Sequence, residues 1–549
     1  MDDKITVGEY LLQRLAELGV RDIFGVPGDF SIDLVGMIDD DPRFNWIGDC
    51  DELNAGYAAD GYARINGVGV LCTTFGPGEL SAVNAIAGAY SEHVPLIKIV
   101  GAPAVAKIQQ KLPLHHCLLN GKYDQSYQIY QQITTASACL DFNNPGEIID
   151  QVIEQCLAKK LPVYLQLPQD VLVYKIPRPR RPLSLVKMAE IAKHELTSLV
   201  ERVSNARQPV ILIGELITRY GLSNELQQFL HDSGYPYVVS WGAKGGVNEN
   251  EANFCGMYAG VFSSAVVREY VESSDCVVSL GWLECEVNLG MFSAKITPAN
   301  RISITAKQVI INGQPLVNID FPTVIRQLIA SVPRYQRELP RYNPHHDNKN
   351  WLLSSTEIGH ENLIYRLSQF LNSEDILVLE TGTIGFTGGY YHLPDNVRII
   401  SSINWYSIGY ALGATTGVCL AHAKSSGRVI LVVGDGSLQM TVQAISTLLR
   451  YQLKPIILVL NNGGYTIERV FLGENAAYND VPNWDYLALP KTFGGKEYSS
   501  VRVQDDAELV GALVSAREDE RLTIIEVMMD KHKQPEALQK LIALRANGQ

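Results

Sequence analysis

One stretch near the C-terminal end restricts the possible folds more than any other. The apolar run 428–433 is predicted to be a buried strand, and the apolar run 455–460 is predicted to be a second one. Residues 441–449 lie between them and carry apolar side chains at helical spacing. A strand, a helix and a strand in this order form a βαβ unit, in which the two strands run parallel. The sequence therefore predicts an α/β fold here.

Both predicted strands end in polar residues. Gly434-Asp435-Gly436 follows the first strand, and Asn461-Asn462 follows the second. The carboxyl ends of parallel strands lie at one edge of a sheet, where such sheets bind ligands, so we expect Asp435 and Asn462 to lie close together. Gly-Asp-Gly alone is a common turn, but two matched strand ends indicate more. Oxygen ligands beside glycine turns are typical of sites that hold Mg²⁺ together with a diphosphate.

Composition and charge exclude several classes of partner. The chain has 549 residues and a formal net charge of −13, which argues against nucleic acid and anionic membranes. No apolar run is long enough to cross a bilayer, and the first residues lack the features of a signal peptide. The nine cysteines form no Cys-x-x-Cys pair and are interpreted as small buried side chains in a reducing compartment. We expect a cytoplasmic protein.

The chain divides into three blocks at two proline-rich, polar segments, residues 176–182 and 333–350. Within each block, apolar runs of strand length alternate with helical patterns, which indicates α/β domains with parallel sheets. The length is compatible with three or four domains. The sequence thus predicts three doubly wound parallel-sheet domains, with boundaries at 1–180, 187–335 and 352–549.

Several other residues could carry chemistry, but each has a simple structural explanation when it is considered alone. Cys117 and Cys285 lack an identifiable activating base and are interpreted as structural. The simple explanations are a helix N-terminus for Glu52, a turn for Asp29, a solvated loop for His115 and His116, an exposed helix face for Glu468, and the core for Ile408.

Taken together and in this order, the motifs resemble those of the thiamine-diphosphate-dependent 2-oxo acid decarboxylases, a family with pyruvate, indolepyruvate, phenylpyruvate and branched-chain members. The likeness covers essentially the whole chain. The His115-His116 pair, combined with the segment 465–468, points to the decarboxylase branch. The other motifs that carry the resemblance are Phe24-Gly25-Val26-Pro27-Gly28-Asp29, Glu52-Leu53-Asn54-Ala55, Asp60-Gly61-Tyr62-Ala63-Arg64, Thr74-Phe75-Gly76, Glu380-Thr381-Gly382-Thr383 and Gly434-Asp435-Gly436-Ser437.

The resemblance implies the cofactors and the assembly. In this family the first block binds the aminopyrimidine of thiamine diphosphate, the third block binds the diphosphate with Mg²⁺, and the middle block is structural. The two cofactor-binding blocks meet across a subunit interface, so we expect a homodimer with shared active sites, paired further into a tetramer. The implied Mg²⁺ ligands are Asp435, Asn462 and the backbone carbonyl of Gly464. The implied cofactor contacts are Glu52, Thr74, Thr383, Tyr406, Ile408, Gly436, Ser437, Asn462, Gly464, Tyr465, Thr466 and Ile467.

The resemblance also implies a reaction, the non-oxidative decarboxylation of a small-molecule 2-oxo acid to an aldehyde and CO₂. Glu52 would hydrogen-bond the pyrimidine ring and so promote loss of the thiazolium C2 proton, and burial would raise its pKa and favour a shared proton. Ile408 would bend the cofactor. A polar cluster would steer the substrate carboxylate and transfer protons, with the individual proton donors left open. Its implied members are Asp29, His115, His116 and Glu468.

Three residues bear on specificity. Gly463 stands where the family has Asp, which predicts a looser turn without loss of Mg²⁺ binding. Tyr406 stands where the family has Gly in Trp-Gly-Ser-Ile, so its side chain must find room, and the substrate pocket is one place for it. Gly385 is small where some members carry an aromatic residue. We therefore expect an enzyme that is broad or favours larger 2-oxo acids, with a pyruvate decarboxylase as the alternative.

Two further classes are weaker alternatives. A carboligase of the acetolactate synthase kind uses the same cofactor, but the histidine pair and Glu468 count against it, and the middle block shows no recognisable flavin site. A non-catalytic binding protein on this scaffold would be expected to have lost Glu52, which is present.

Overall fold

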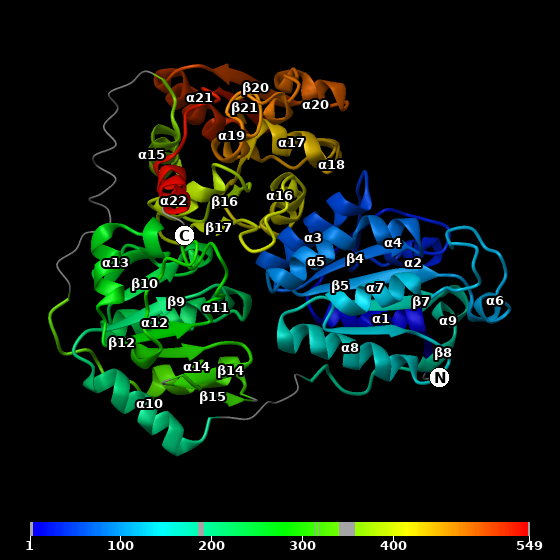
Figure 1. The fold of residues 1–549 in the computed structure, drawn as a ribbon. Coiled ribbons are helices and arrows are strands. Elements are labelled where there is room, and N and C mark those ends of the chain that lie inside the picture. Colours follow the sequence, from blue (N-terminus) through cyan, green and yellow to red (C-terminus); the bar gives the residue numbers. More distant parts are fainter. Residues whose placement is uncertain (1–3, 185–190, 312, 318, 340–356, 547–549) are drawn as a thin grey trace.

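Figure 1 shows three α/β regions, each built on its own sheet, with the first block on one side and the central and third blocks stacked on the other. No described helix is both long enough and apolar enough to cross a bilayer. The computed structural model describes residues 4–184, 191–311, 313–317, 319–339 and 357–546.

The first block folds around a six-stranded sheet with the order β3-β2-β4-β5-β7-β6. All of its strands are parallel, as the sequence predicts. The sequence pattern misses β3 and β6, because these short strands are partly exposed and lack an apolar run. The strands are β2 (Asp22–Gly25), β3 (Asn45–Gly48), β4 (Gly69–Thr74), β5 (Leu96–Ala102), β6 (Ala136–Cys139) and β7 (Val163–Pro168).

Two helix boundaries in the first block shape the site. The helix of Glu52 begins at that residue, because the Asp51 side chain caps it by accepting a hydrogen bond from Asn54 N at 2.9 Å. The following helical stretch is interrupted at Ala82. The helices used below are α1 (Val7–Glu17), α2 (Ile32–Asp39), α3 (Glu52–Asn66), α4 (Pro77–Ser81) and α5 (Val83–Ser91).

The central block has a seven-stranded mixed sheet with the order β11-β10-β9-β12-β13-β14-β15. Its strands are parallel up to β13, and β14 and β15 extend it antiparallel. A tight turn joins β13 to β14, and such a short connection allows only antiparallel pairing. The strands are β9 (Pro209–Ile213), β10 (Tyr237–Ser240), β11 (Phe254–Tyr258), β12 (Cys276–Leu280), β13 (Arg301–Ile304), β14 (Gln308–Ile311) and β15 (Gln314–Val317).

The third block has a six-stranded parallel sheet with the order β17-β16-β18-β19-β21-β20. The predicted βαβ unit is confirmed, and Gly434 pairs with Leu460, so the two strand ends lie level. The helical pattern of the sequence starts at residue 441, but α17 already begins at Asp435, directly after the strand. The elements are β16 (Ile376–Leu379), β17 (Arg398–Ile400), β18 (Val429–Gly434), α17 (Asp435–Thr441), α18 (Ala444–Arg450), β19 (Ile456–Asn461), β20 (Tyr498–Val503) and β21 (Leu522–Met528).

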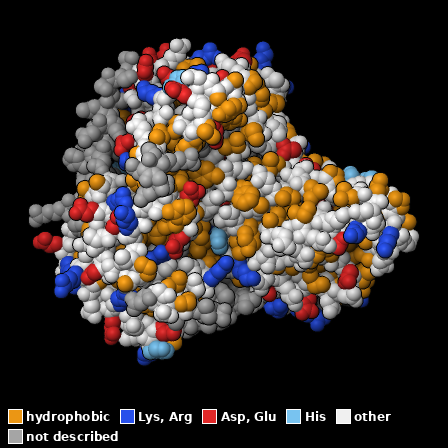
Figure 2. All heavy atoms as spheres, in the orientation of Figure 1, with side chains coloured by type: hydrophobic (Ala, Val, Ile, Leu, Met, Phe, Trp, Pro, Cys, Tyr) orange, Lys and Arg blue, Asp and Glu red, His pale blue; other side chains and the backbone are white. Residues whose placement is uncertain are grey.

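The first and third blocks touch through α3 and α16 (Tyr410–Ala421), which lie side by side in Figure 1. Glycines bring the two backbones together. A Cβ atom on Gly417 would lie 1.8 Å from Ala58 O, and one on Gly61 would lie 2.2 Å from Ala414 O. Figure 2 shows hydrophobic side chains gathered over the first and third blocks on this face.

The C-terminal helix α22 (Glu536–Ala546) packs into the core of the central block, although it follows the third sheet in the chain. Ala537, Leu538 and Leu541 are buried in one cluster with strands β9 and β12. The domain boundaries therefore stay a proposal, and the starts proposed at 187 and 352 lie outside the described residues.

Candidate active site

Asp435 lies where β18 becomes α17 and is almost completely buried. Its carboxylate oxygens accept backbone hydrogen bonds from Gly436 N and Gly463 N, both at 2.7 Å. Burial raises the pKa of Asp435 to about 6, because a charge is placed here without a counter-ion. A bound cation would supply that counter-ion, so the environment suits a metal ligand.

Two further oxygen atoms converge on this carboxylate. The side-chain oxygen of Asn462 lies 3.1 Å from Asp435 Oδ1 and 2.8 Å from the carbonyl oxygen of Gly464. Adjacent ligands of an octahedral Mg²⁺ ion lie about 3.0 Å apart when the metal–oxygen distances are about 2.1 Å. The three predicted metal ligands are thus brought together at separations that fit Mg²⁺.

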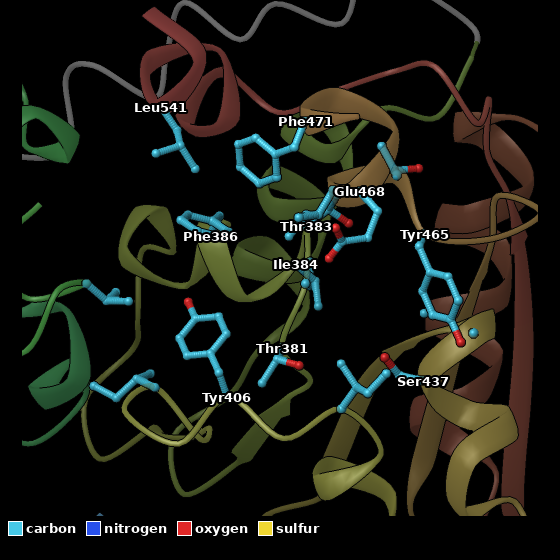
Figure 3. Close-up of a pocket in the computed structure, with 18 of the residues that line it drawn as sticks. Thr381, Thr383, Ile384, Phe386, Tyr406, Ser437, Tyr465, Glu468, Phe471 and Leu541 are labelled. Atoms are coloured by element: carbon cyan, nitrogen blue, oxygen red, sulfur yellow. The ribbon is translucent and has the colours of Figure 1, made fainter. Parts of the chain in front are cut away.

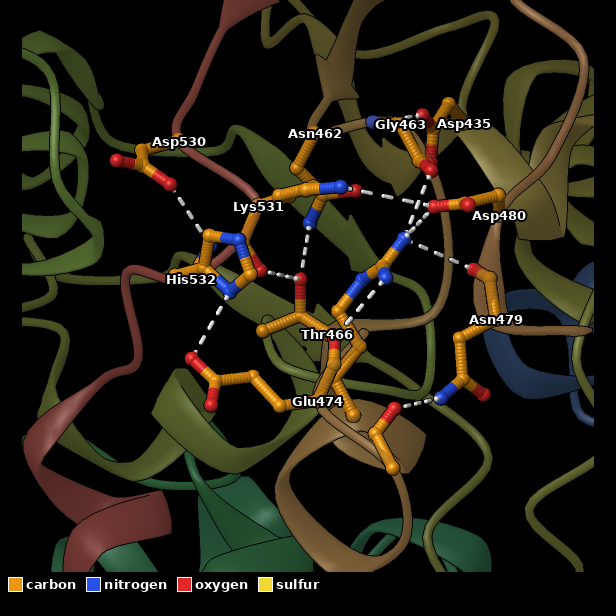
Figure 4. A network of polar contacts seen from close by, with 12 residues as sticks. Asp435, Asn462, Gly463, Thr466, Glu474, Asn479, Asp480, Asp530, Lys531 and His532 are labelled. Carbon is orange, nitrogen blue, oxygen red and sulfur yellow. Dashed lines mark hydrogen bonds and ion pairs between the residues drawn. The ribbon is translucent and has the colours of Figure 1, made fainter. Parts of the chain in front are cut away.

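The neighbouring Thr466 fixes the orientation of the Asn462 amide. The Thr466 hydroxyl donates to Lys531 O at 3.1 Å, as Figure 4 shows, and a hydroxyl has only one proton to donate. It must therefore accept from Asn462 Nδ2, which lies 3.0 Å away. This leaves the amide oxygen facing Asp435 and Gly464, where a cation is needed to offset the repulsion between oxygens. In the opposite orientation the amide nitrogen would donate to Asp435 and to Gly464 O without a metal. The amide oxygen would then need the Thr466 hydroxyl proton, which the Lys531 carbonyl already accepts.

The turn after Asn462 is held by a buried arginine, Arg469, which no sequence motif indicates. Arg469 Nη2 donates to Gly463 O at 3.1 Å and pairs with Asp480 Oδ1 at 2.5 Å. Gly463 and Gly464 have positive φ angles of 69° and 137°, and a Cβ atom on Gly464 would lie 2.0 Å from Asn479 O. Gly463 has open space around it, so its positive φ angle, and not a lack of room, is the reason for glycine at this position. The hydrogen bond from Arg469 acts against the looser turn that the sequence predicts.

A cavity of about 730 Å³ opens beside this turn. Figure 3 shows Ser437 and Tyr465 on one side of it, and Phe386, Phe471 and Leu541 on the other. All of the predicted cofactor and metal residues of the third block line this cavity, as does Glu468, which lies in α19 (Thr466–Phe471). They are Thr383, Tyr406, Ile408, Asp435, Gly436, Ser437, Asn462, Gly464, Tyr465, Thr466 and Ile467.

The segment with Tyr406 and Ile408 forms a strained turn in the cavity wall. Tyr406 has a φ of 57°, which is unusual for a bulky residue, and its ring lies 6.2 Å from that of Phe386. Its side chain has found room against the apolar end of the cavity (Figure 3). Gly385, by contrast, does not line this cavity, so its small size gives no support to a preference for larger substrates.

Glu380, which the sequence indicates only as part of a motif, supports this turn. It is completely buried at the end of β16, and its carboxylate accepts hydrogen bonds from Thr381 N at 2.9 Å and Ala411 N at 3.1 Å. It thereby joins β16 to the start of α16, directly after the Tyr406–Ile408 turn. Burial raises the pKa of Glu380 to about 7.

In the first block, the structure brings Asp29, His115 and His116 together. His115 Nε2 lies 2.5 Å from Asp29 Oδ2, and His116 Nδ1 lies 3.8 Å from Asp29 Oδ1. Phe30 stacks on His115 with the ring centres 4.9 Å apart, which orients the imidazole. Asp29 and His115 are exposed in the single chain, so this polar cluster faces outward.

Glu52 and Thr74 lie at the same edge of the first sheet. Glu52 is half-buried at the start of α3, and burial raises the pKa of its carboxyl group. The Thr74 hydroxyl is buried without a hydrogen-bond partner. A Cβ atom on Gly78 would lie 2.9 Å from both Glu52 Oε1 and Thr74 Cγ2, so the glycine makes room for both side chains. A carboxyl group and an unsatisfied hydroxyl fit a ligand with ring nitrogen and amino groups.

The two halves of the predicted site do not meet within one chain. Among the described residues, none between 4 and 180 lines the cavity of the third block. The structure therefore assembles two half-sites, one with the metal ligands and one with Glu52 and the histidine pair.

Comparisons with known proteins agree with these half-sites. The N-terminal, central and C-terminal domain models of the thiamine pyrophosphate enzymes match residues 5–126, 196–322 and 380–527. Pyruvate decarboxylases of Aspergillus fumigatus and Kluyveromyces marxianus are 38% and 37% identical to the chain. The alignments cover 97% and 99% of the chain, and 96% and 99% of the relatives.

The chain belongs to the thiamine-diphosphate-dependent 2-oxo acid decarboxylases.

In this decarboxylase the described residues fit both cofactors. The oxygen cluster around Asp435 fits Mg²⁺, and Ser437 and the start of α19 line the same cavity, where they could hold a diphosphate. The sequence does not identify Phe386, Phe471, Leu541 and Arg469 as site residues. Arg469 and Phe471 lie in α19, Phe386 lies in the 3₁₀ segment Gly385–Tyr390, and Leu541 lies in α22. Packing brings these elements together, and no local motif marks the four residues.

Proposed function

We propose that the substrate of this decarboxylase is pyruvate, which would give acetaldehyde and CO₂. The observation that carries the proposal is the group of relatives named pyruvate decarboxylase, which includes an isozyme of Saccharomyces cerevisiae at 35% identity over 99% of the chain. This is the alternative in the sequence analysis, and the comparisons support it better than a preference for larger acids.

A broader substrate range is the second candidate, and one observation favours it. The cavity has an apolar wall of Phe386, Phe471 and Leu541, which could contact a longer side chain. The same cavity must also hold the cofactor, so its volume alone does not argue for a large substrate.

The proposal assigns each group of residues a task. Asp435, Asn462 and the Gly464 carbonyl would hold Mg²⁺. When bound, thiamine diphosphate supplies the carbon nucleophile and takes up the electron pair that CO₂ leaves behind. Glu52 would share a proton with the pyrimidine ring, which its raised pKa favours. The Asp29–His115–His116 cluster and Glu468 would orient the substrate carboxylate and move protons to and from the product.

We also propose that the active site is shared between two subunits. The proposal is supported by the two separate half-sites and by exposed apolar side chains on the first and third blocks (Figure 2). A second copy would place the first-block cluster of one subunit over the cavity of the other. Those exposed side chains include Leu80, Tyr90, Trp405, Ile408 and Met440. Pairing of dimers into tetramers stays a prediction, as does a cytoplasmic location, which the nine free cysteines support.

A substrate comparison tests the proposed function. The kcat/KM values would be measured for pyruvate, a branched-chain 2-oxo acid, phenylpyruvate and indolepyruvate, with the products identified. We expect pyruvate to have the highest value and acetaldehyde to be the product. A higher value for phenylpyruvate or indolepyruvate would favour the second candidate, and acetolactate as the main product would identify a carboligase.

A further inference from the structure

A lysine lies in the middle of the first sheet, where lysines are rarely found. Lys98 is in β5, between β4 and β7, and its side chain is completely buried. Its Nζ donates a hydrogen bond to Thr73 Oγ1. Among the described residues, no carboxylate lies within ion-pair distance of this ammonium group. A methionine or leucine would fill the same space without desolvating a charge, so the lysine is not needed for packing.

The Thr73 hydroxyl links Lys98 to Thr74, a predicted cofactor contact in the first block. It donates to Thr74 O at 3.2 Å, and Thr74 carries the buried hydroxyl that lacks a partner. A Cβ atom on Gly78 would lie 3.6 Å from Thr73 Cβ and 2.9 Å from Glu52 Oε1. Thr73 and Glu52 therefore both lie beside Gly78, and Lys98 is bonded to Thr73.

Lys98 interacts electrostatically with two carboxylates, those of Glu79 and Glu52. They differ in whether other residues already hydrogen-bond them. Glu79 already accepts hydrogen bonds from Gly76 N at 2.8 Å and from the Tyr164 hydroxyl at 2.7 Å. Glu52 accepts none from another residue in the described part of the chain, and the charge of Lys98 opposes the rise in the pKa of its carboxyl group that burial causes.

We infer that Lys98 is a positioning residue for the reaction: its buried charge sets the proton affinity of Glu52, and its bond to Thr73 holds the strand end that carries Thr74. The inference rests on the proposed role of Glu52. The other titratable groups that face this pair are Asp51, Cys72, Glu79 and Tyr164. Burial lowers the pKa of Lys98 to about 8, so the charge is present at neutral pH.

The test replaces Lys98 by methionine, which keeps the length of the side chain and removes the charge. Lys107→Met, an exposed lysine of the same block, is the matched control. The affinity of the full-length apoprotein for thiamine diphosphate with Mg²⁺ would be measured by tryptophan fluorescence between about pH 5 and about pH 9, a range that spans the titration of a raised glutamate and a lowered lysine. The affinity is plotted against pH, and the transition that Glu52→Gln abolishes is assigned to Glu52. The pH at the centre of that transition is called the Glu52 midpoint.

We expect Lys98→Met to move the Glu52 midpoint to higher pH, because a carboxyl group without a nearby cation holds its proton more tightly. Lys107→Met should leave the midpoint in place. A folded Lys98→Met protein with the wild-type midpoint would overturn the inference and leave the proposed function standing. Failure of the wild-type protein to bind the cofactor would overturn both. If Lys98→Met does not fold, Thr73→Val removes the hydrogen bond to the ammonium group, and its midpoint must also rise for the inference to hold.

Discussion

The hydroxyl of Tyr57 lies 2.8 Å from Ser407 Oγ, and this contact joins the helix that begins with Glu52 to the turn that carries Tyr406 and Ile408. Asn84 Nδ2 donates to both hydroxyl groups at 2.9 Å and completes a three-membered polar contact between the first and third blocks. The two halves of the cofactor-binding machinery in one chain are thus held in register by neutral hydrogen bonds.

Tyr57→Phe should loosen this junction. We expect a loss of about 1 kcal/mol in the free energy of unfolding, typical of a hydrogen bond in a partly buried place, together with weaker cofactor binding. Urea denaturation and a fluorescence titration would measure the two effects. Tyr174→Phe, at an exposed tyrosine of the same block, is the control. Equal stability and affinity in both variants would show that the contact is dispensable.

Asp435→Asn should abolish Mg²⁺-dependent retention of thiamine diphosphate. The amide keeps the size of the side chain but loses the negative charge that the metal requires. In a thermal shift assay, the wild-type protein should be stabilised by Mg²⁺ with the cofactor and should lose that stabilisation when a chelator is added. The variant should show no shift, whereas Asp33→Asn, on the exposed side of α2, should behave as wild type. A normal shift in Asp435→Asn would refute the metal site.

Two inactive variants should complement each other if the site is shared. Glu52→Gln should lose turnover but keep the cofactor, and Glu468→Gln should also lose turnover. A dimer with one chain of each kind has one doubly altered site and one intact site, so random mixing should restore roughly a quarter of the wild-type activity. The mixed dimers would be prepared by co-expression and assayed with pyruvate. No recovery in verified mixed dimers would show that both half-sites act within one chain.

Glu380 should make the stability of the protein depend on pH. Its folded-state pKa of about 7 lies above the ordinary value of 4.5, so the folded chain binds this proton more tightly than the unfolded chain. Stability from this group is full below about pH 4.5 and falls as the pH rises toward 7. The melting temperature of the wild type minus that of Glu380→Gln should therefore decrease across this window. If this difference in melting temperature does not change with pH, the pKa of Glu380 is not raised in the folded protein and the prediction is wrong.

The sequence predicts those site residues whose position follows from their immediate neighbours along the chain. Apolar runs that end in Gly-Asp-Gly and Asn-Asn place Asp435 and Asn462 at one sheet edge, and the structure confirms that placement. The β14–β15 hairpin and the start of α17 at Asp435 were missed, because turn geometry and helix starts leave only a weak signal in a single sequence.

The supporting residues were missed for a different reason. Arg469, Glu380 and Lys98 are buried charges whose partners come from distant parts of the chain or from the backbone, so their surroundings exist only after folding. The looser turn expected at Gly463 stays a prediction, and sequence reasoning could not include the arginine that bonds to this turn. It also expected Gly385 to enlarge the pocket, since it could not show that this residue faces elsewhere.

The glycine contact between α3 and α16 sets a limit for anyone who redesigns this enzyme. At Gly61 and Gly417 there is no space for even one more carbon atom, so substitutions there would push apart the helix of Glu52 and the helix that follows Ile408. Phe386, Phe471 and Leu541 line the cavity and belong to neither helix of that contact. Libraries aimed at new substrates can therefore be restricted to these three positions, and the helix pair can be kept as a fixed frame.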